Sequence, residues 1–462
     1  MVSFVDVARY LPSIREPEKE QSLKEMLAWT GIVLVLYFVL GSINVYGANA
    51  AAVQQALSRL ETFQTLLGAQ IGSLITLGIG PIVTSSIVLQ MLVGSDLLSW
   101  DTNTEEGKAR FQAAQKVLAY ALTVVEAVGW VLSGNFGNVA GDPWLVALLS
   151  GQVMLGGFMI ILMDDLIQKW GFGSGTGLFI SAGVSKAVYI SAISPLTSTG
   201  KLYWTVAGSA TPVGAFFKFL TSFNPLALLP IISTIVVFSV VVYMQAMKVE
   251  IPLTFGNVRG FGQKWPLKFL YTSNMPVILI AALVTNVRIV ASSLAGASGC
   301  SILGCFSNGQ AVSGLVNMLQ APTTIVSTFL RSGEIGMGGV FHILFYISVY
   351  AFGSIVFSIF WMRTSGQDAD SVADQIQNTG MKVPGFRKDK RVIKKVLNRY
   401  IPALTILSGF AVGLLAALAN MTQAAGGGTG ILLTVMILYK LYEQLAQKHM
   451  EELHPALKDF LG

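Results

Sequence analysis

The stretch TFQTLLGAQIGSLITLGIGPIVTSSIVLQMLVGS, from Thr62 to Ser95, contains 34 residues and no charged side chain. A helix needs about 20 mostly apolar residues to cross the hydrocarbon core of a membrane. The stretch is therefore too long for one straight span, and the Gly-Ile-Gly-Pro sequence at residues 78–81 interrupts it. We predict a short helix or re-entrant segment at about residues 60–77, followed by a spanning helix at about residues 78–94.

The composition of the whole chain agrees with a membrane protein. Of the 462 residues, 53% are hydrophobic and only 12% are charged, whereas soluble domains carry about 25% charged residues. The N-terminus opens with a stretch of mixed charge, Arg9 to Lys24, and not with the pattern of a cleavable signal peptide.

Further apolar runs on both sides of the deciding stretch complete a set of ten expected spans. Those before and after it are Leu27–Tyr46, Val117–Phe136, Trp144–Met163, Gly173–Ile193, a span within Thr221–Met247, Thr272–Ile289, Met337–Arg363, and the run Tyr400–Tyr439. The last run is too long for one helix, and Gly426–Gly428 divides it into a ninth and a tenth span. The predicted fold class is an all-α integral membrane protein with both termini on one side.

The distribution of Lys and Arg predicts the orientation, because these residues accumulate in cytoplasmic loops. With a cytoplasmic N-terminus, the inside segments hold 24 of the 30 Lys and Arg residues. Two inside loops are long, at residues 248–268 and 363–399, and the second ends in a dense basic run. Topology bias explains much of this charge, but loops of this length also suit docking to a polyanion such as RNA.

Two prolines lie at corresponding positions of two possible five-helix halves. Pro81 interrupts the second span, and Pro276 lies at the start of the seventh. Interrupted segments at matching positions indicate an inverted repeat with a pathway at its interface. This pattern fits a channel and a secondary transporter of a small solute equally well.

No catalytic, metal or cofactor site emerges, and we expect a protein that is not an enzyme. The motif of intramembrane serine proteases is not met at Ser174, and that of intramembrane aspartyl proteases is not met at Asp165. No nucleotide-binding loop motif occurs in the sequence. A solute transporter needs a cluster of ionisable groups in mid-membrane, and only Glu126 lies there. We expect Glu126 to be a buried residue with a hydrogen bond inside the bundle, and Asp164–Asp165 to cap the end of the fourth span. Cys300 and Cys305 lie in a long loop, as a disulfide or as two free thiols.

Several longer motifs carry a resemblance to a known family. They are LGIGPIVTSS at residues 77–86 with QMLVG at 90–94, GSGTGLFI at 173–180, YTSNMPVI at 271–278, GTGILL at 428–433, and YEQL at 442–445 with ELHP at 452–455. These motifs resemble helices two, five, seven and ten, and the C-terminal end, of the archaeal and eukaryotic SecY-type subunits of the Sec protein-conducting channel. The resemblance covers nearly the whole chain.

The resemblance implies two inverted five-helix halves around a central hourglass pore with a lateral gate between helices two and seven. The implied halves are residues 27–195 and 196–446, between a cytoplasmic segment at 1–26 and a tail at 447–462. The implied pore ring is Ile79, Val83, Thr176, Ile180, Ile278 and Leu433, in which Thr176 departs from the usual aliphatic pattern. The implied lateral gate includes Thr84, Ser85, Gln90 and Asn286. The implied plug is residues 61–72, with Phe63, Leu66, Leu67 and Gly68.

The resemblance also implies partners and a location. Arg259 and Arg387 match ribosome-contacting positions, although Asn257 stands where the family often has another basic residue. The implied partners are small subunits of the SecE/gamma and beta types, the ribosome with its nascent polypeptide, the signal recognition particle pathway and the lipid bilayer. The implied location is the cell membrane.

Overall fold

The computed structural model describes a mostly helical protein. It covers residues 8, 10–19, 21–59, 64, 67–94, 97–98, 100, 104–137, 139, 141–197, 201–205, 211–255, 262–272, 275–295, 300–307, 310–323, 328–329, 333–334, 336–378, 381–382 and 390–453. The chain forms two compact units: residues 1–187 with 437–462, and residues 188–436.

Each of the ten expected spans coincides with a helix. These helices are α2 (Leu23–Ser42), α5 (Gly80–Gly94), α6 (Glu105–Leu132), α7 (Pro143–Trp170), α8 (Gly175–Ile193), α10 (Leu229–Ala246), α11 (Met275–Ala295), α14 (Met337–Thr364), α16 (Lys390–Met421) and α17 (Gly428–Leu453). Among the described residues, seven helices are long and apolar enough to cross a membrane, and α5 and the first part of α11 are shorter apolar helices. Several helices extend beyond their predicted apolar runs, because hydropathy reports the lipid-embedded part and not the helix ends.

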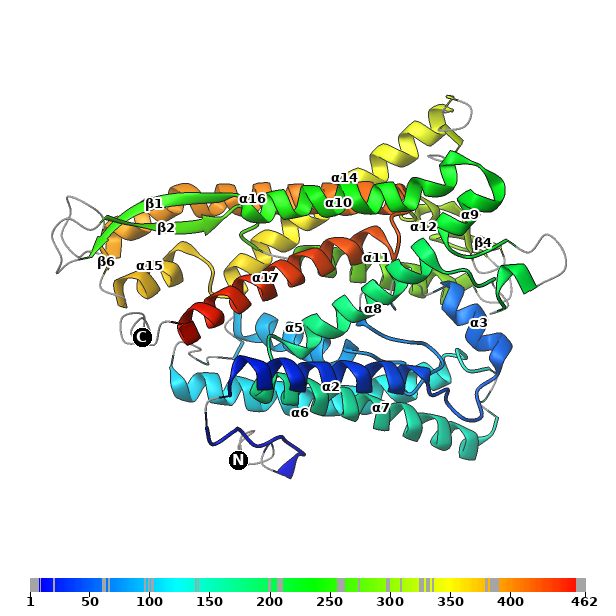
Figure 1. The fold of residues 1–462 in the computed structure, drawn as a ribbon, viewed down its shortest axis with the longest axis horizontal. Coiled ribbons are helices and arrows are strands. Elements are labelled where there is room, and N and C mark those ends of the chain that lie inside the picture. Colours follow the sequence, from blue (N-terminus) through cyan, green and yellow to red (C-terminus); the bar gives the residue numbers. More distant parts are fainter. Residues whose placement is uncertain are drawn as a thin grey trace. The chain divides into compact units, whose positions relative to one another are not determined.

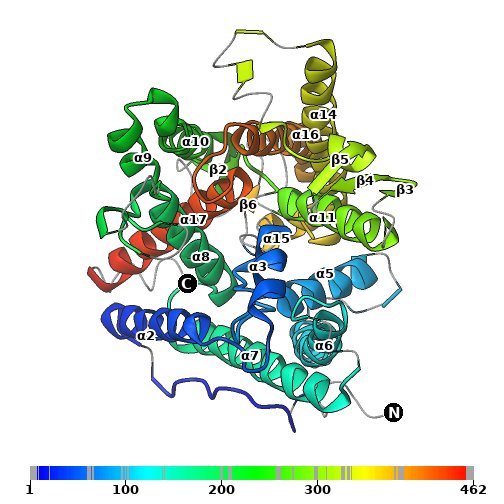
Figure 2. The same ribbon diagram turned by 90° about the vertical axis from the view of Figure 1, so that its right-hand side faces the viewer.

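In the first unit, α7 packs against both α2 and α6, and α6 packs against α5 (Figures 1 and 2). Local sequence explains where these helices begin. The Ser22 hydroxyl and the Glu25 carboxylate form a capping box at the start of α2. Asp142 accepts from two backbone N–H groups at the start of α7, where a proline occupies the first turn. A further helix, α3 (Ala50–Arg59), was not expected, because it carries too few apolar residues to span a membrane.

Between α3 and α5, residues 68–79 form a run of turns and not a helix. Their backbone is nonetheless paired: Val45 N–H donates to Gly72 O (2.9 Å), and Leu74 N–H donates to Ile43 O (3.0 Å). Irregular backbone at membrane depth is tolerated only where protein covers it and its polar groups are satisfied. Of the segment predicted at about residues 60–77 as a short helix or a re-entrant segment, Gln64 and Leu67 are helical and residues 68–77 are not, and re-entry into the membrane stays a prediction. At about 1.5 Å per residue, the 15 residues of α5 are too short to cross the hydrocarbon core alone.

The two prolines at corresponding positions of the predicted halves, Pro81 and Pro276, each occupy the second residue of a helix. Pro81 follows Gly80 at the start of α5, and Pro276 follows Met275 at the start of α11. A proline in the first turn costs no helical hydrogen bond, because that N–H has no partner inside the helix. The spanning helix predicted from about residue 78 therefore begins at Gly80, with Pro81 in its first turn.

In the second unit, α14 packs against the second part of α16, and the two helices cross in Figure 1. Gly409 and Gly413 of α16 lie against the backbone of α14, and a Cβ at Gly413 would lie 2.5 Å from the Tyr350 carbonyl oxygen. Small residues four apart allow membrane helices to approach this closely. Thr272 adds hydroxyl contacts to Ser358 (2.6 Å) and Ser408 (3.1 Å).

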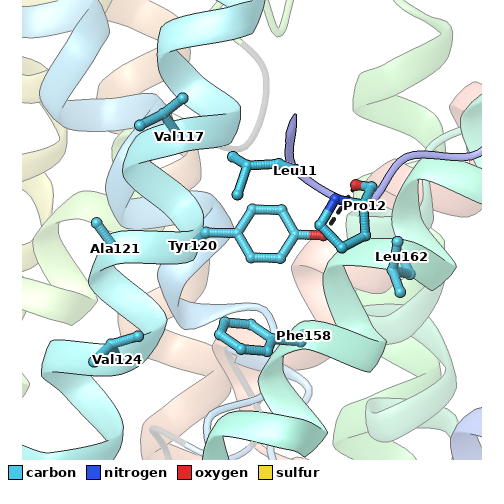
Figure 3. Close-up of a pocket in the computed structure, with 8 residues that line it drawn as sticks. All are labelled: Leu11, Pro12, Val117, Tyr120, Ala121, Val124, Phe158 and Leu162. Atoms are coloured by element: carbon cyan, nitrogen blue, oxygen red, sulfur yellow. Dashed lines mark hydrogen bonds between the residues drawn. The ribbon is translucent and has the colours of Figure 1, made fainter. Parts of the chain in front are cut away.

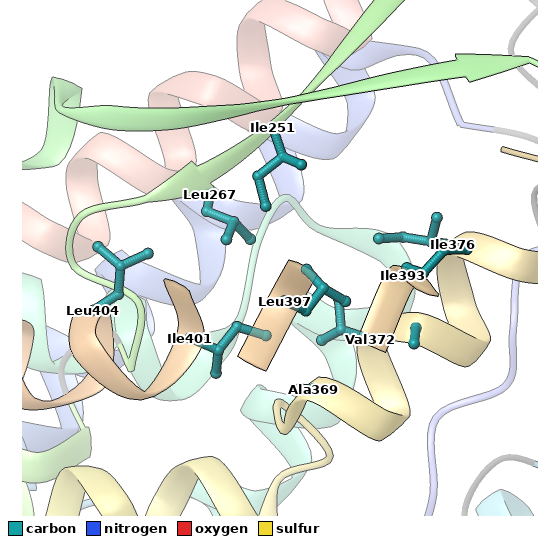
Figure 4. Packing of buried hydrophobic residues seen from close by; sticks show 10 residues of the cluster. Ile251, Leu267, Ala369, Val372, Ile376, Ile393, Leu397, Ile401 and Leu404 are labelled. Carbon is teal, nitrogen blue, oxygen red and sulfur yellow. The ribbon is translucent and has the colours of Figure 1, made fainter. Parts of the chain in front are cut away.

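The same unit carries a sheet-and-helix body that the sequence analysis described only as two long loops. Strand β1 (Lys248–Phe255) pairs antiparallel with β2 (Gly262–Lys268) and with β6 (Met381–Lys382). This sheet, α15 (Ala369–Asn378) and the start of α16 share a buried aliphatic core, shown in Figure 4. Its members are Ile251, Leu267, Ala369, Val372, Ala373, Ile376, Ile393, Leu397, Ile401 and Leu404.

A small sheet follows α11. Strands β3 (Cys300–Ser301), β4 (Gly304–Ser307) and β5 (Gln310–Gly314) pair antiparallel in that order, and α12 (Leu315–Met318) follows them. Cys300 and Cys305 lie opposite each other and form a disulfide. The disulfide alternative is therefore the one that the structure adopts. The link from α8 to α10 contains η1 (Tyr203–Thr205), α9 (Ala215–Ser222) and η2 (Pro225–Leu228).

Candidate functional site

Four residues of the predicted pore ring belong to the first unit. Ile79 precedes α5 directly and is fully buried, and Val83, one turn later, is half-buried. Thr176 and Ile180 lie one turn apart on α8, where Thr176 is half-buried and Ile180 is buried. Residues four apart on a helix share a face, so each pair presents its side chains in one direction.

The other two residues of the predicted ring belong to the second unit. Ile278 lies in the first turn of α11 and is buried, and Leu433 lies in the second turn of α17 and is fully buried. All six side chains lack a charge, and only Thr176 carries a polar atom. The ring as a whole draws on both units and stays a prediction.

The end of the predicted plug lies against both ring-bearing segments of the first unit. Leu67 O accepts a hydrogen bond from Ile79 N–H (2.9 Å). Gly68 adopts a positive φ of 54°, and a Cβ there would lie 3.0 Å from the Phe179 carbonyl oxygen. Glycine fits at residue 68 because both the left-handed backbone and the close approach to α8 disfavour a side chain.

Two polar contacts from neighbouring helices hold this segment. The Tyr37 hydroxyl donates to Gly68 O (2.6 Å), and the Tyr37 ring stacks on Phe179 with 5.0 Å between ring centroids. Lys186 Nζ donates to Gln70 Oε1 (3.0 Å). Tyr37 is fully buried. Lys186 and Gln70 lie 116 residues apart along the chain, so the sequence does not report this contact.

Three of the predicted gate residues lie on α5. Thr84 Oγ1 donates to Gly80 O (2.9 Å), and Ser85 Oγ donates to Ile82 O (2.8 Å). Gln90 Nε2 donates to Ser86 Oγ (3.1 Å). Each of these three side chains therefore donates a hydrogen bond within its own helix. The fourth, Asn286, belongs to α11, but its side chain lies outside the described residues.

The sequence analysis did not assign Glu126 to the gate, yet the structure places it beside α5, the helix that carries three of the predicted gate residues. Glu126 extends from α6 toward α5, where its Oε2 would lie 3.2 Å from a Cβ added at Gly80. Its carboxyl group also interacts with the Thr84 side chain. The mid-span depth of Glu126 was the only signal in the sequence, and depth does not identify the neighbouring helix.

Asp164 has a different role from the one expected of it. Helix α7 continues to Trp170, so Asp164 does not cap its end. The buried Asp164 carboxylate instead accepts from Thr176 N–H (2.8 Å) in the first turn of α8 and from Gln168 Nε2 (2.7 Å). A carboxylate satisfies unpaired N–H groups and is favoured by the dipole at a helix N-terminus. Asp164 thus positions the helix that carries Thr176 and Ile180.

Several predicted residues lie outside the described part of the chain. They are Phe63 and Leu66 of the plug, and Arg259 and Arg387 of the two basic loops. In the basic run that follows Arg387, Lys390 and Lys394 pair with Asp374 and Asp370 of α15, at 2.7 and 2.6 Å. These two lysines stabilise the sheet-and-helix body, which leaves fewer of the basic residues available to bind a polyanion.

The chain is similar over its whole length to characterised proteins. A sequence model of the SecY family matches residues 73–442. The protein translocase subunit SecY of Methanothermobacter thermautotrophicus is 43% identical over 459 residues, which are 98% of this chain and 97% of that protein. The same subunit of Methanocaldococcus jannaschii is 41% identical over 467 residues, 100% of both chains.

Solved structures give the same result. A protein-conducting channel aligns with a TM-score of 0.79 and 40% identity, covering 98% of both chains. Sec61 in a canine ribosome–channel complex from the endoplasmic reticulum aligns with a TM-score of 0.76 and 40% identity, again over 98% of both chains. The all-α membrane fold is thus the fold of these channels, and the chain belongs to the SecY family.

Proposed function

We propose that this chain is the pore-forming subunit of a Sec protein translocase. It would pass unfolded secretory polypeptides across the membrane and release apolar segments sideways into lipid. The observation that carries this proposal is the similarity over 98% of the chain to a protein-conducting channel. A secondary transporter of small solutes is disfavoured because Glu126, the one mid-span acid, is used to contact Thr84.

The predicted ring suits this function because of its chemistry. Apolar side chains at a constriction exclude water and thereby resist the flow of ions. They also offer no fixed hydrogen bond, so they do not select among the side chains of a passing polypeptide. The contacts of Leu67 and Gly68 with Ile79 and Phe179 support a plug that adjoins the ring on one side.

We further propose a cell-membrane protein with cytoplasmic termini that works with two small subunits of the SecE/gamma and beta types. The distribution of Lys and Arg supports the orientation. The relation to Sec61 in a ribosome–channel complex supports a ribosome, and hence a nascent chain, as partners. Arg259 and Arg387 remain the predicted contacts. No ATP-binding motif occurs in the sequence, so the driving force would come from a partner.

Site-specific crosslinking tests this function. A photoreactive residue at Val83 or Ile278 is combined with a ribosome-stalled secretory chain in membranes. We expect a crosslink that requires an intact signal sequence. The matched control is Val125, an exposed residue of α6 outside the predicted ring, which should give none. Failure at both ring positions, with the subunit inserted normally, would place the polypeptide path elsewhere and reopen the transporter hypothesis.

Conductance tests the seal separately. Removing residues 61–72 and replacing Ile79, Ile180 and Ile278 with Gly should make the idle channel leak ions in a planar bilayer. Unchanged conductance would overturn the ring assignment without affecting the crosslinking result.

A further inference from the structure

Helix α9 lies in the link between the spanning helices α8 and α10. Directly before α9, Gly214 N–H donates to the carbonyl oxygen of Ser194 (3.0 Å), the residue that follows α8. After α9, η2 leads straight into α10, and Figure 1 shows α9 at that end of α10. Span five ends and span six begins at the same membrane surface, so the link between them lies where the hydrocarbon core meets the headgroups.

One face of α9 and its C-cap residue form an exposed apolar stripe. Phe216, Leu220 and Phe223 are spaced by four and three residues, which places them on the same side of a helix. All three side chains are exposed, Phe223 by 79%. We refer to these three side chains as the apolar stripe of α9. Contiguous apolar surface of this kind marks contact with a protein or a membrane.

The opposite face of α9 is polar. Lys218, Thr221 and Ser222 are all exposed, and Lys218 is the one charged residue of the helix. The two hydroxyls donate to carbonyl groups of the helix itself, Thr221 to Phe217 O (3.0 Å) and Ser222 to Lys218 O (2.7 Å). Aromatic residues on one face and a lysine on the other are typical of a helix that lies in the plane of a membrane surface.

The backbone at Phe223 supports the same interpretation. Phe223 adopts a left-handed conformation with a φ of 51°, and its N–H donates to Phe219 O (2.7 Å). Bulky residues seldom adopt this conformation, whereas asparagine, the type of the next residue, does so more readily. The structure thus holds an aromatic ring outward at a cost in backbone strain. Transfer of that ring from water into an apolar environment would offset this cost.

A neighbouring turn adds aromatic residues to this surface. In η1, the Tyr203 ring lies 5.7 Å from the Phe217 ring of α9 and 5.0 Å from the Trp204 ring, measured between centroids. Tyr203 therefore connects the turn to α9, and Trp204 stays 59% exposed. Tyr and Trp are enriched where a membrane meets water, because each has an apolar body and a group that forms hydrogen bonds.

The apolar stripe continues a surface that lipid covers in a membrane protein. Next along the chain, Ile232, Ile235 and Val236 are exposed apolar residues of the spanning helix α10. Acyl chains cover such a helix face along the hydrocarbon core. Since α9 lies at the end of this helix, the same bilayer reaches the stripe.

The first unit treats an apolar surface differently. There, Leu11 and Pro12 of the N-terminal segment cover an apolar cavity of about 400 Å³ between α6 and α7 (Figure 3). Tyr120 in its lining donates to Pro12 O (3.2 Å), so the chain itself closes this surface. Within the part of the chain that the structure describes, no segment covers the apolar stripe of α9 in this way, because its three side chains stay exposed.

We propose that α9 is an interfacial helix that anchors the link between α8 and α10 in the membrane surface. The apolar stripe inserts among the upper parts of the acyl chains, and Lys218 extends toward the headgroups and water. Under the orientation proposed above the leaflet is the outer one, but the insertion itself does not depend on that orientation. The anchored link begins where the two predicted halves meet, at residues 195–196, and therefore ties that joint to the bilayer.

A spin-label scan tests the insertion. Each residue from 215 to 223 is replaced in turn by Cys, labelled with a nitroxide, and reconstituted with the partner subunits into phosphatidylcholine vesicles. The two native cysteines form a disulfide, so the introduced thiol is the one that reacts. We expect collisions with oxygen, which dissolves in the bilayer, to be most frequent at the stripe. Collisions with the water-soluble complex NiEDDA should be most frequent at residues 218, 221 and 222, with the same period of about 3.6 residues and the opposite phase.

Two other results of the scan would overturn the proposal. Frequent collisions with NiEDDA at the stripe would mean that it faces water. Rare collisions with both reagents at the stripe would mean that a protein covers it, either a small subunit or a second copy of this chain. The scan uses no translocating chain, and no scanned residue belongs to the predicted ring, plug or gate, so its failure would leave the proposed function unaffected.

A matched pair of variants sharpens the test. Leu220→Asp and Thr221→Asp introduce the same charge at adjacent residues on opposite faces of α9. With the label at residue 223, Leu220→Asp should raise the collision rate with NiEDDA several-fold, because a carboxylate among acyl chains is unfavourable and draws the stripe toward water. Thr221→Asp should leave the rate unchanged. Equal responses to the two variants would contradict the insertion.

The unmodified protein supplies a measurement that needs no variant. Phosphatidylcholine with a diazirine in one acyl chain is added to the same vesicles and activated by light. We expect label on the apolar stripe and none on Lys218 or Thr221. Label that is absent from the stripe, or equal on both faces of α9, would overturn the proposal even if Leu220→Asp does not fold.

Discussion

Helix α16 packs in two different ways along its 32 residues. Its first part contributes Ile393, Leu397 and Ile401 to the aliphatic core of the sheet-and-helix body. Its second part presents Ser408, Gly409 and Gly413 to α14. The change occurs near Pro402, close to the predicted start of the ninth span at about residue 400.

The difference between the two parts follows from the solvent. Outside the membrane, burying large aliphatic side chains removes them from water, which is the main driving force of packing. Within lipid that force is absent between helices, because acyl chains are as apolar as leucine. Association there depends on close backbone approach and on hydroxyl hydrogen bonds such as that between Thr272 and Ser358.

The largest effect is expected in the water-exposed part. Leu397 is 1% exposed, and Leu397→Ala should lower the free energy of unfolding by about 2–5 kcal/mol through lost burial and a residual cavity. Thermal unfolding of the reconstituted protein measures the change. Leu407→Ala removes the same atoms from a 51% exposed, lipid-facing site of the same helix and should cost far less. Equal losses at both sites would contradict the explanation that burial from water drives packing in the first part of α16 but not in the second.

Enlarging a small residue should have the next largest effect. Gly413→Leu introduces a side chain at the Tyr350 carbonyl, and we expect a loss of about 1–3 kcal/mol or more from forced separation of α14 and α16. The control is Gly129→Leu on α6, where a Cβ would meet no atom within 4 Å. If both variants unfold at the same temperature, close approach does not stabilise this helix pair.

The hydroxyl contacts should contribute less. A double-mutant cycle with Thr272→Val and Ser358→Ala should give a coupling energy of about 0.6 kcal/mol, and at most about 1.7 kcal/mol, as found for other membrane hydrogen bonds. Unfolding of the two single variants and the double variant supplies the cycle. Strictly additive losses would show that the 2.6 Å contact adds nothing beyond packing.

The smallest effect is expected at the surface pairs of the sheet-and-helix body. Lys394→Ala breaks the pair with Asp370 and should cost about 0–1 kcal/mol, decreasing as salt is added. Lys395→Ala, at an exposed neighbour, is the control. A loss that persists at high salt would indicate packing by the lysine stem instead of charge.

The second surface pair predicts a direction of pH dependence. The hydrogen bond to Asp374 raises the pKa of Lys390. A raised lysine pKa stabilises the folded chain fully below the ordinary lysine pKa, and this contribution is lost as the pH rises through the raised value. Between pH 7 and 9, the contribution of Lys390 to the free energy of unfolding should therefore stay constant. Loss of the Lys390 contribution within that range would contradict the assignment.

Hydropathy was sufficient to find the ten helices that coincide with the expected spans, because each span must hide its backbone in an apolar run. It could not place their ends: α7 continues seven residues beyond the predicted Met163. It also missed the β1–β2 hairpin, since pairing between Lys248 and Lys268 depends on contacts with α15 and α16 that local sequence does not encode.

The functional residues divide in the same way. Motifs predicted Ile79, Ile180 and Leu433 as ring residues; the structure buries all three, and their place in a pore stays a prediction. Motifs could not show that Asp164 caps α8, that Glu126 lies against α5, or that Tyr37 donates to Gly68. Each of these contacts joins segments that are far apart or separated by a turn, so no residue pattern along the chain reports it.

By itself, the sequence determined that this chain is a membrane protein, where its spans lie and which family it resembles, because apolar length and motif identity are local properties. Only the tertiary structure decided how the turns at residues 68–79 are satisfied, which lysines of the basic run are already paired, and that an apolar cavity lies beneath the N-terminal segment. Those features depend on side chains brought together from distant segments, and their energies arise only when the helices pack.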